Sequence, residues 1–132
     1  MNLNINTGKI RVTVNDDPDR VIAFNPTDVG FAERFYALVS DIETKQREFM
    51  GRAKVLDEAG DERTGEQLHL LRDICTYMRD QIDTVFGEGT SAVAFGDAMT
   101  LDMFTQFFDG ILPIVRQARA EKLTPYMPKM QA

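Results

Sequence analysis

The sequence predicts a mainly α-helical protein of the α+β type. A β-hairpin is expected first, followed by a long antiparallel helical hairpin and a third, kinked amphipathic helix. Three observations predict this order: a period-two pattern at residues 10–14, apolar residues at steps of three and four across residues 25–86, and a wide apolar surface at residues 101–118. With 132 residues, the chain is expected to form a single domain, residues 1–132.

The β-hairpin is expected within residues 3–24, so that residues 1–24 form the first unit. Apolar and polar side chains alternate from Ile10 to Val14, an apolar run resumes at Val21–Phe24, and residues 15–19 between them are dense in turn formers. The aspartates of this turn lack the later glycine and glutamate of a calcium loop. Because two strands alone are marginally stable in water, they should pack on helices or join another sheet edge.

The helical hairpin is expected to span residues 25–86. Asn25 is a suitable cap for its first helix, Pro26 suits the first helical position, and Phe24 with Val29 could form a hydrophobic staple. This helix should run to about Glu58. Its seam is formed mainly by Phe35, Leu38, Ile42, Phe49, Ala53 and Leu56.

The second helix is predicted from near Thr64 to Phe86. Its apolar stripe consists of Leu68, Leu71, Cys75, Met78, Ile82 and Val85. Two long helices with heptad-like seams and a short connection predict an antiparallel pair.

Residues 87–123 are expected to form a short turn and a C-terminal helix. Gly87–Thr90 should end the second helix, and Ser91–Phe95 should form a single turn. The third helix is predicted to start at Asp97 or Thr100 and to kink at Pro113, where the ring removes an amide donor. Residues 124–132 are expected to be a flexible tail.

The third helix has apolar side chains on more than half of its circumference, whereas a surface helix needs a single stripe of about 100°. One stripe contains Leu101, Phe104, Phe108, Ile111 and Val115, and the second contains Met103, Phe107, Ile114 and Ala118. Either the rest of the domain encloses this helix or one face binds another chain. The candidate partner-binding residues are Met103, Phe104, Phe107, Phe108, Ile111 and Ile114.

Composition argues against several functional classes. The net charge of −6 opposes nucleic-acid binding, and the few basic residues near the C-terminus are typical of a solvated helix end. No apolar run is long enough for a membrane-spanning helix, and the start of the sequence lacks the pattern of a signal peptide. The single cysteine fits a reducing compartment, so a cytoplasmic protein is expected.

No catalytic, metal or cofactor site is predicted. His69 is the only histidine, and it lies about 120° around the helix from Cys75, so the two side chains diverge. Glu66 and His69 have the spacing used in di-iron bundles, but such sites need a second copy of this motif. We therefore expect a binding protein rather than an enzyme.

Three segments together carry a resemblance to a known family: Val-Phe-Gly-Glu-Gly-Thr-Ser at 85–91, Phe-Gly-Asp at 95–97, and Thr-Leu-Asp-Met-Phe-Thr-Gln-Phe-Phe-Asp-Gly-Ile at 100–111. This arrangement resembles small tail-assembly chaperone-like proteins encoded by phages and prophages of Gram-positive bacteria. The resemblance implies an assembly factor in the cytoplasm of the host cell. It also implies two partners: the helical tape-measure protein and the tail tube subunits that polymerise around it.

An alternative function is a small phage accessory or anti-defence protein that sequesters a host protein or a small ligand. Composition does not separate the two functions, but gene neighbourhood would, because a chaperone gene should directly precede a very long helical reading frame. Self-association is also open. The edge of the β-hairpin could pair between subunits, or the second stripe of the third helix could form a dimer seam.

Overall fold

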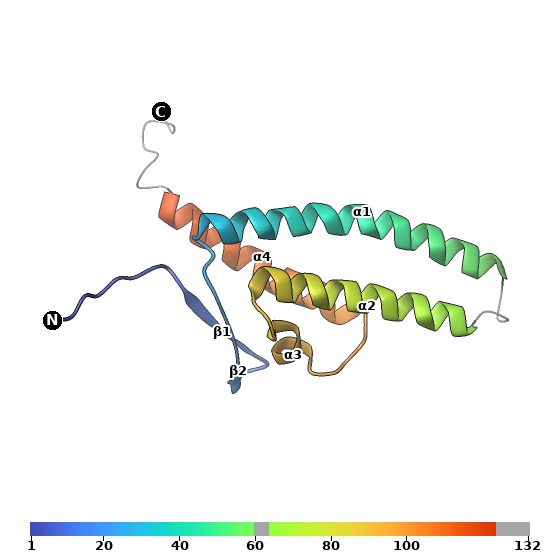
Figure 1. Ribbon diagram of the computed structural model, residues 1–132, viewed down its shortest axis with the longest axis horizontal. Coiled ribbons are helices and arrows are strands. Elements are labelled where there is room, and N and C mark those ends of the chain that lie inside the picture. Colours follow the sequence, from blue (N-terminus) through green and yellow to red (C-terminus); the bar gives the residue numbers. More distant parts are fainter. Residues whose placement is uncertain (60–63, 124–132) are drawn as a thin grey trace, which may run out of the picture.

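The computed structural model describes residues 1–59 and 64–123, apart from the side chains of 58, 59 and 121–123. Its elements are β1 (Ile10–Val14), β2 (Asp17–Phe24), α1 (Val29–Ala59), α2 (Thr64–Phe86), α3 (Thr90–Phe95) and α4 (Asp102–Leu123). The predicted fold class is confirmed: an N-terminal antiparallel β-hairpin precedes a mainly helical remainder (Figure 1).

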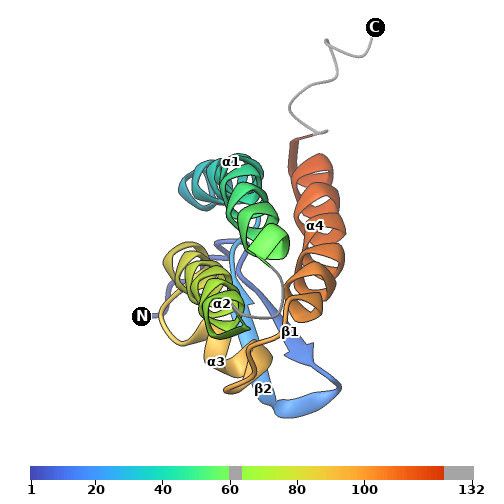
Figure 2. The ribbon, with the colours of Figure 1, turned by 90° about the vertical axis from the view of Figure 1, so that its right-hand side faces the viewer.

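The three long helices form a triangle when viewed end-on (Figure 2). Figure 1 shows α1 and α2 running antiparallel, with α4 alongside the first half of α1 and the second half of α2. The β-hairpin and α3 cover the end of the molecule where α1 begins and α2 ends. The last turns of α1 and the first turns of α2 therefore project beyond the other elements. None of the helices in the described part of the chain is long and apolar enough to cross a membrane.

The β-hairpin is shorter than predicted. Its strands pair in a register that aligns Ile10 with Phe24 and Val12 with Ile22, and the expected strand residues before Ile10 adopt no regular structure. Asn15 and Asp16 form the turn with φ values of 54° and 59°, a left-handed conformation that these two residue types tolerate. The inward side chains of β2 are buried, so the hairpin packs on the helices as expected.

The start of α1 differs from the predicted cap. Asp28, not Asn25, caps the helix, because its Oδ2 accepts a hydrogen bond of 2.8 Å from the Phe31 amide. The Asn25 side chain instead accepts hydrogen bonds within the preceding turn. The predicted staple is also wrong, since Val29 is 62% exposed and the Phe24 ring lies 5.4 Å from that of Phe31.

An aromatic cluster joins four elements at the covered end of the molecule. Phe86, at the end of α2, lies at its centre. Its ring centroid is 5.2 Å from that of Phe24 in β2, 5.3 Å and 6.0 Å from those of Phe31 and Phe35 in α1, and 5.3 Å from that of Phe107 in α4. These pairs have the edge-to-face geometry that aromatic rings favour.

The apolar stripe of α2 is confirmed over its second half and corrected at its start. Leu68 and Leu71 are 62% and 41% exposed, whereas Leu70 is buried. The reason is that α4 does not extend along this end of the hairpin (Figure 1), so α2 packs on α1 alone and part of its apolar face stays open.

Side-chain hydrogen bonds fix α3 and the segment after it. Asp83 accepts hydrogen bonds from the amide and hydroxyl of Ser91, at 2.7 Å and 3.0 Å. Arg79 donates to the carbonyls of Gly96 and Ala98, and Gly96 has a φ of 61°. Because Arg79 holds this segment in a non-helical conformation, the next helix cannot begin there.

Accordingly, α4 starts at Asp102, not at Asp97 or Thr100 as predicted. The helix continues through Pro113, as expected. Pro113 and Asp109 are both exposed, so water can satisfy the Asp109 carbonyl that loses its amide partner. The predicted flexible tail, residues 124–132, lies outside the described residues.

We predict that Phe86→Ala lowers the free energy of unfolding by about 3–5 kcal/mol, because it removes a ring that four elements share. Phe86→Leu should cause a smaller loss, since it leaves a smaller cavity. Urea denaturation monitored by circular dichroism measures both. Equal stability of Phe86→Ala and the unmodified protein would show that the cluster contributes nothing to the fold.

Candidate functional site

The six α4 residues predicted to bind a partner do not share one exposed face. Phe104, Phe107 and Ile111 are core residues, exposed by 4%, 9% and 4%. The other three are half-buried on opposite flanks of the helix: Phe108 on one, and Met103 and Ile114 on the other. The excess apolar surface of α4 is therefore divided between its contact with the core and two grooves.

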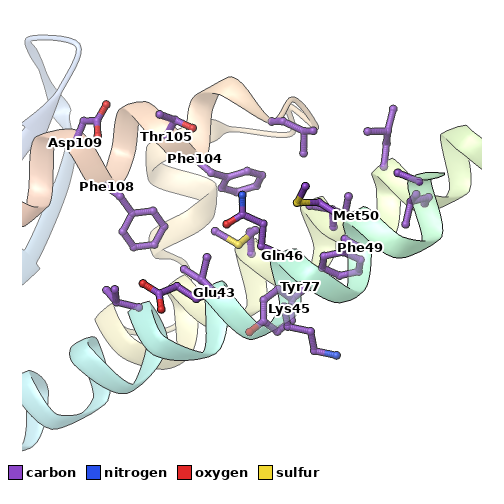
Figure 3. A pocket seen from close by; sticks show the side chains of 18 of the residues that line it. Glu43, Lys45, Gln46, Phe49, Met50, Tyr77, Phe104, Thr105, Phe108 and Asp109 are labelled. Carbon is purple, nitrogen blue, oxygen red and sulfur yellow. The ribbon is translucent and has the colours of Figure 1, made fainter. Parts of the chain in front are cut away.

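The first groove, called here the helix groove, lies between α1, α2 and α4 and has a volume of about 620 Å³ (Figure 3). Its apolar walls are Val39, Ile42, Phe49, Met50 and Ala53 of α1, Leu70, Leu71, Ile74, Tyr77 and Met78 of α2, and Leu101, Phe104, Phe108 and Leu112 at α4. A groove of this size and lining is typical of sites that take an apolar ligand or side chains of a partner.

The helix groove includes several exposed apolar side chains. Met50, Leu71 and Leu101 are exposed by 63%, 41% and 42%, and each belongs to a different wall. Exposed apolar residues are ordinary when scattered, but a set gathered around one hollow indicates an interaction surface. This open surface results from the offset of α4 along the bundle, because α1 and α2 continue past the start of α4 (Figure 1).

The α1 and α2 walls were not among the site residues predicted from the sequence, all of which lie in the third helix. The sequence carries a partial signal for these walls. The apolar pattern of the first helix covers residues 35–56, a longer stretch than residues 101–118 of the third helix, so the third helix cannot cover the whole of the first. The offset of α4 along the bundle, which leaves the start of α2 uncovered, has no such signal in the spacing.

The rim of the helix groove is acidic on two sides. Glu43 of α1 and Asp109 of α4 both lie at its edge (Figure 3), and neither forms an ion pair with any described residue. The one lysine of the lining, Lys45, pairs with Glu48 at 3.1 Å and lies 5.6 Å from the Tyr77 ring. The groove is therefore apolar inside with unpaired negative charge on its rim.

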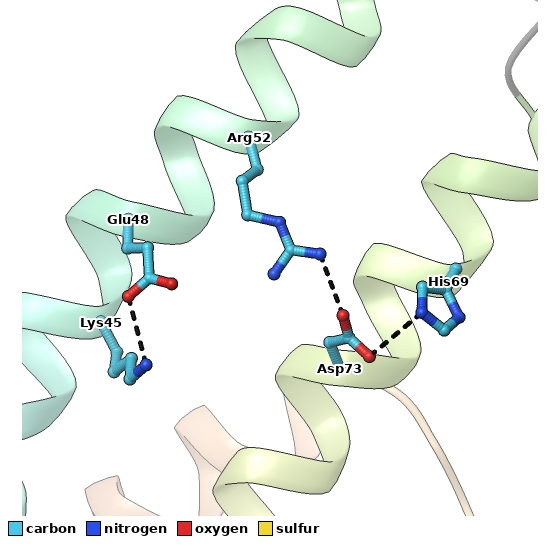
Figure 4. A network of polar contacts seen from close by, with 5 residues as sticks. All are labelled: Lys45, Glu48, Arg52, His69 and Asp73. Carbon is cyan, nitrogen blue, oxygen red and sulfur yellow. Dashed lines mark hydrogen bonds and ion pairs between the residues drawn. The ribbon is translucent and has the colours of Figure 1, made fainter.

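A polar contact connects α1 and α2 near their projecting ends (Figure 4). Arg52 donates a 2.9 Å hydrogen bond to Asp73, which also lies 3.7 Å from His69. The Arg52 hydrogen bond lowers the pKa of Asp73, an effect partly offset by desolvation and assisted by the charge of His69. The His69 side chain is 71% exposed, so this contact is a surface link between helices.

The residues weighed for catalysis do not assemble into a reactive pair. Cys75 is buried in the core, and burial raises the pKa of its thiol, which stays protonated at neutral pH. His69 lies on the exposed surface, away from that core position. Among the residues that the structure describes, no group of three His, Cys, Asp or Glu side chains could hold a metal ion.

A second groove, called here the sheet groove, lies between the β-hairpin and the other flank of α4 and has a volume of about 550 Å³. Val12 and Val14 of β1 form one wall, and Met103 and Ile114 of α4 form the opposite wall. Arg20 is the charged residue of its lining, and its guanidinium donates hydrogen bonds of 3.0 Å and 2.8 Å to carbonyls of α3. Arg20 remains a cation in these bonds, so the groove has an apolar lining with one positive charge.

Comparison with known proteins identifies a family. A family model described as "Family of unknown function (DUF6673)" matches residues 19–131, and the chain belongs to this family. Searches of curated proteins and of solved structures gave no match. The matched region includes the whole helix groove, and it includes the sheet groove apart from the wall formed by β1 and the turn after it.

We predict that Phe107→Glu lowers the free energy of unfolding by about 3 kcal/mol or more, because it removes a buried ring and places a carboxylate in the core. Thr105→Glu adds the same charge at an exposed position of α4 and should change stability by less than about 0.5 kcal/mol. Urea denaturation compares the two. Similar stabilities would place Phe107 on the surface, against the structure.

We also predict that Arg52→Gln raises the pKa of the Asp73 carboxyl toward its ordinary value of 3.8. A carboxyl whose pKa is lowered in the folded state stabilises the fold above its unfolded-state pKa, and this contribution is lost as the pH falls through the lowered value. Carboxyl carbon chemical shifts followed against pH measure the change. Lys45→Gln, which removes the cation paired with Glu48, is the control and should leave the Asp73 titration unchanged.

Proposed function

We propose that the protein is a tail-assembly chaperone that holds an apolar helical segment of a tape-measure protein in the helix groove during assembly of the tail tube. The observation that carries the proposal is the open apolar surface formed by Met50, Leu71 and Leu101. An assembly factor of this kind must cover apolar helical surface of its partner until that surface is buried in the finished structure.

The shape of the groove supports a helix as the bound element. Its walls are three helices, and the projecting parts of α1 and α2 present an apolar seam that α4 does not cover. A fourth helix laid along this seam would complete a four-helix arrangement locally. The partner would then contribute apolar side chains at spacings of three and four residues, as in other helix-in-groove contacts.

Charge supports solubility of the complex and a preference among partners. The chain has a net charge of −6, so a loaded chaperone still repels other copies. Glu43 and Asp109 on the rim favour a helix with basic residues beside its apolar face. Such an assembly step takes place in the host-cell cytoplasm, the compartment that we propose for the protein.

The segments that carry the resemblance to tail-assembly chaperone-like proteins form one part of the molecule. Residues 85–91 include the end of α2 and the start of α3, and residues 95–97 begin at the last residue of α3. Residues 100–111 lead into α4 and contribute Phe104 and Phe108 to the groove. The resemblance therefore concerns the region that shapes one wall of the proposed binding site. The tape-measure protein is proposed as partner on that basis.

We predict that Leu71→Glu reduces the amount of tape-measure protein that co-purifies with the chain by about tenfold, because a carboxylate in the groove opposes an apolar helix. Co-expression of the chain with the tape-measure protein of the same genome, followed by affinity purification, gives the measurement. Urea denaturation must show that the variant remains folded.

Val29→Glu is the matched control. Val29 is 62% exposed and lies at the start of α1, outside the groove, so this variant should retain the partner. If Leu71→Glu folds normally and binds as much tape-measure protein as Val29→Glu, the helix groove is not the binding site. If the unmodified chain captures none, the proposed partner is wrong.

A further inference from the structure

Residues 1–7, called here the arm, have the pattern of a β-strand but no sheet to join within one copy. Met1, Leu3 and Ile5 alternate with three asparagines. In the structure the arm has no regular secondary structure and projects away from the body (Figure 1). Leu3 and Ile5 are 80% and 72% exposed. Alternation of this kind is typical of a strand with one buried face.

The base of the arm is fixed in a direction that leads away from the hairpin. The carbonyl of Thr7 accepts a hydrogen bond from the Asn25 side chain, and the Gly8 amide donates one of 2.9 Å to Asn6. Gly8 has a φ of +92°, and a Cβ there would lie 2.3 Å from the Thr27 hydroxyl. The corner at Gly8 therefore requires glycine, and while these bonds hold, the arm cannot fold back on its own β1.

The β-hairpin offers a free edge on the side of β1. Among the described residues, the backbone of β1 pairs with β2 alone. The far side of β2 is covered, because α3 packs there and Arg20 binds its carbonyls. Unpaired edges accept extended segments of other chains, and a third strand would strengthen a sheet that has only two.

The sheet groove provides a place for the apolar side chains of such a strand. It lies beneath β1, with Val12 and Val14 on one side and Met103 and Ile114 on the other. A strand paired with β1 directs alternate side chains toward the helices, as β1 does. Leu3 and Ile5 would then enter the groove, and the asparagines between them would face water.

The alternating pattern of the arm and its lack of charged side chains favour a second copy as the occupant. Two chains of net charge −6 repel each other at long range, so contact is favoured where neither surface adds negative charge. The arm carries no charged side chain, and the charged group of the sheet groove, Arg20, is already bonded to α3. The apolar face of the arm is thus compatible with the apolar lining of the sheet groove, and the arm brings no charged side chain into it.

We propose that the arm of one copy pairs with the β1 edge of a second copy, with Leu3 and Ile5 packed in the sheet groove against α4. Reciprocal exchange between two copies gives a closed dimer, and one-way exchange gives a longer chain of copies. This contact uses the flank of α4 opposite to the helix groove, so it is independent of the proposed function.

Light scattering during size-exclusion chromatography tests the proposal. The unmodified protein should have at least twice the 14.9 kDa mass of one chain, and the variant with Leu3→Asp and Ile5→Asp should have the mass of a monomer. The matched control carries Asn2→Asp and Asn4→Asp, which add the same charge to the water-facing side of the arm. This control should keep the mass of the unmodified protein.

A cysteine experiment locates the contact. In a Cys75→Ser background, chains with Ile5→Cys are mixed with chains carrying Met103→Cys and oxidised. A disulfide joining the two kinds of chain is expected, whereas Thr105→Cys, on the helix-groove side of α4, should not form it.

Three results would overturn the proposal: a monomeric unmodified protein, an oligomer that survives Leu3→Asp with Ile5→Asp, or a link to Thr105→Cys instead of Met103→Cys. The effect of Leu71→Glu on tape-measure binding tests the helix groove, whereas the arm experiments test the sheet groove. The two proposals therefore fail separately.

Discussion

The contact on which the rest of the structure depends is the meeting of four elements at the Phe86 ring. Burial of large aromatic side chains is among the strongest sources of stability in a small core, and here one ring is shared by β2, α1, α2 and α4. Because the shared core is concentrated at this end, the opposite end of the helical hairpin is left with one packing partner per helix. The helix groove is a consequence of that unequal distribution.

The helical hairpin could be predicted from the sequence because its apolar residues repeat along residues 35–56 and 68–85, so a local error in one turn does not change the assignment. The start of α1 was less predictable, since Asn25 and Asp28 are both good caps and lie three residues apart. The Asn25 side chain is engaged instead by Thr27 and by the carbonyl of Thr7, and the contact with Thr7 joins distant parts of the sequence.

The site was less predictable than the fold. The sequence indicates that α4 is too apolar for an ordinary surface helix, but not which side chains face the core, because that depends on its lateral position against α1 and α2. As a result, Phe107 proved to be a core residue, and Phe108 and Met103 proved to line different grooves. The arm, residues 1–7, has the alternating pattern of a strand, but the spacing of its residues does not indicate which strand it pairs with.

The contact between Arg52 and Asp73 has a mechanical consequence. It is an exposed ion pair, a type of contact that contributes little to stability, and it crosses the hairpin close to the tips of α1 and α2. Near the tips, the helices are joined by this ion pair and by the buried side chains of Leu56 and Leu70, whereas several packed rings around Phe86 hold the other end. We expect α1 and α2 to separate more easily at their tips than at the Phe86 cluster. The helix groove could then widen to accept partner helices with side chains of different size, while the packing around Phe86 stays intact.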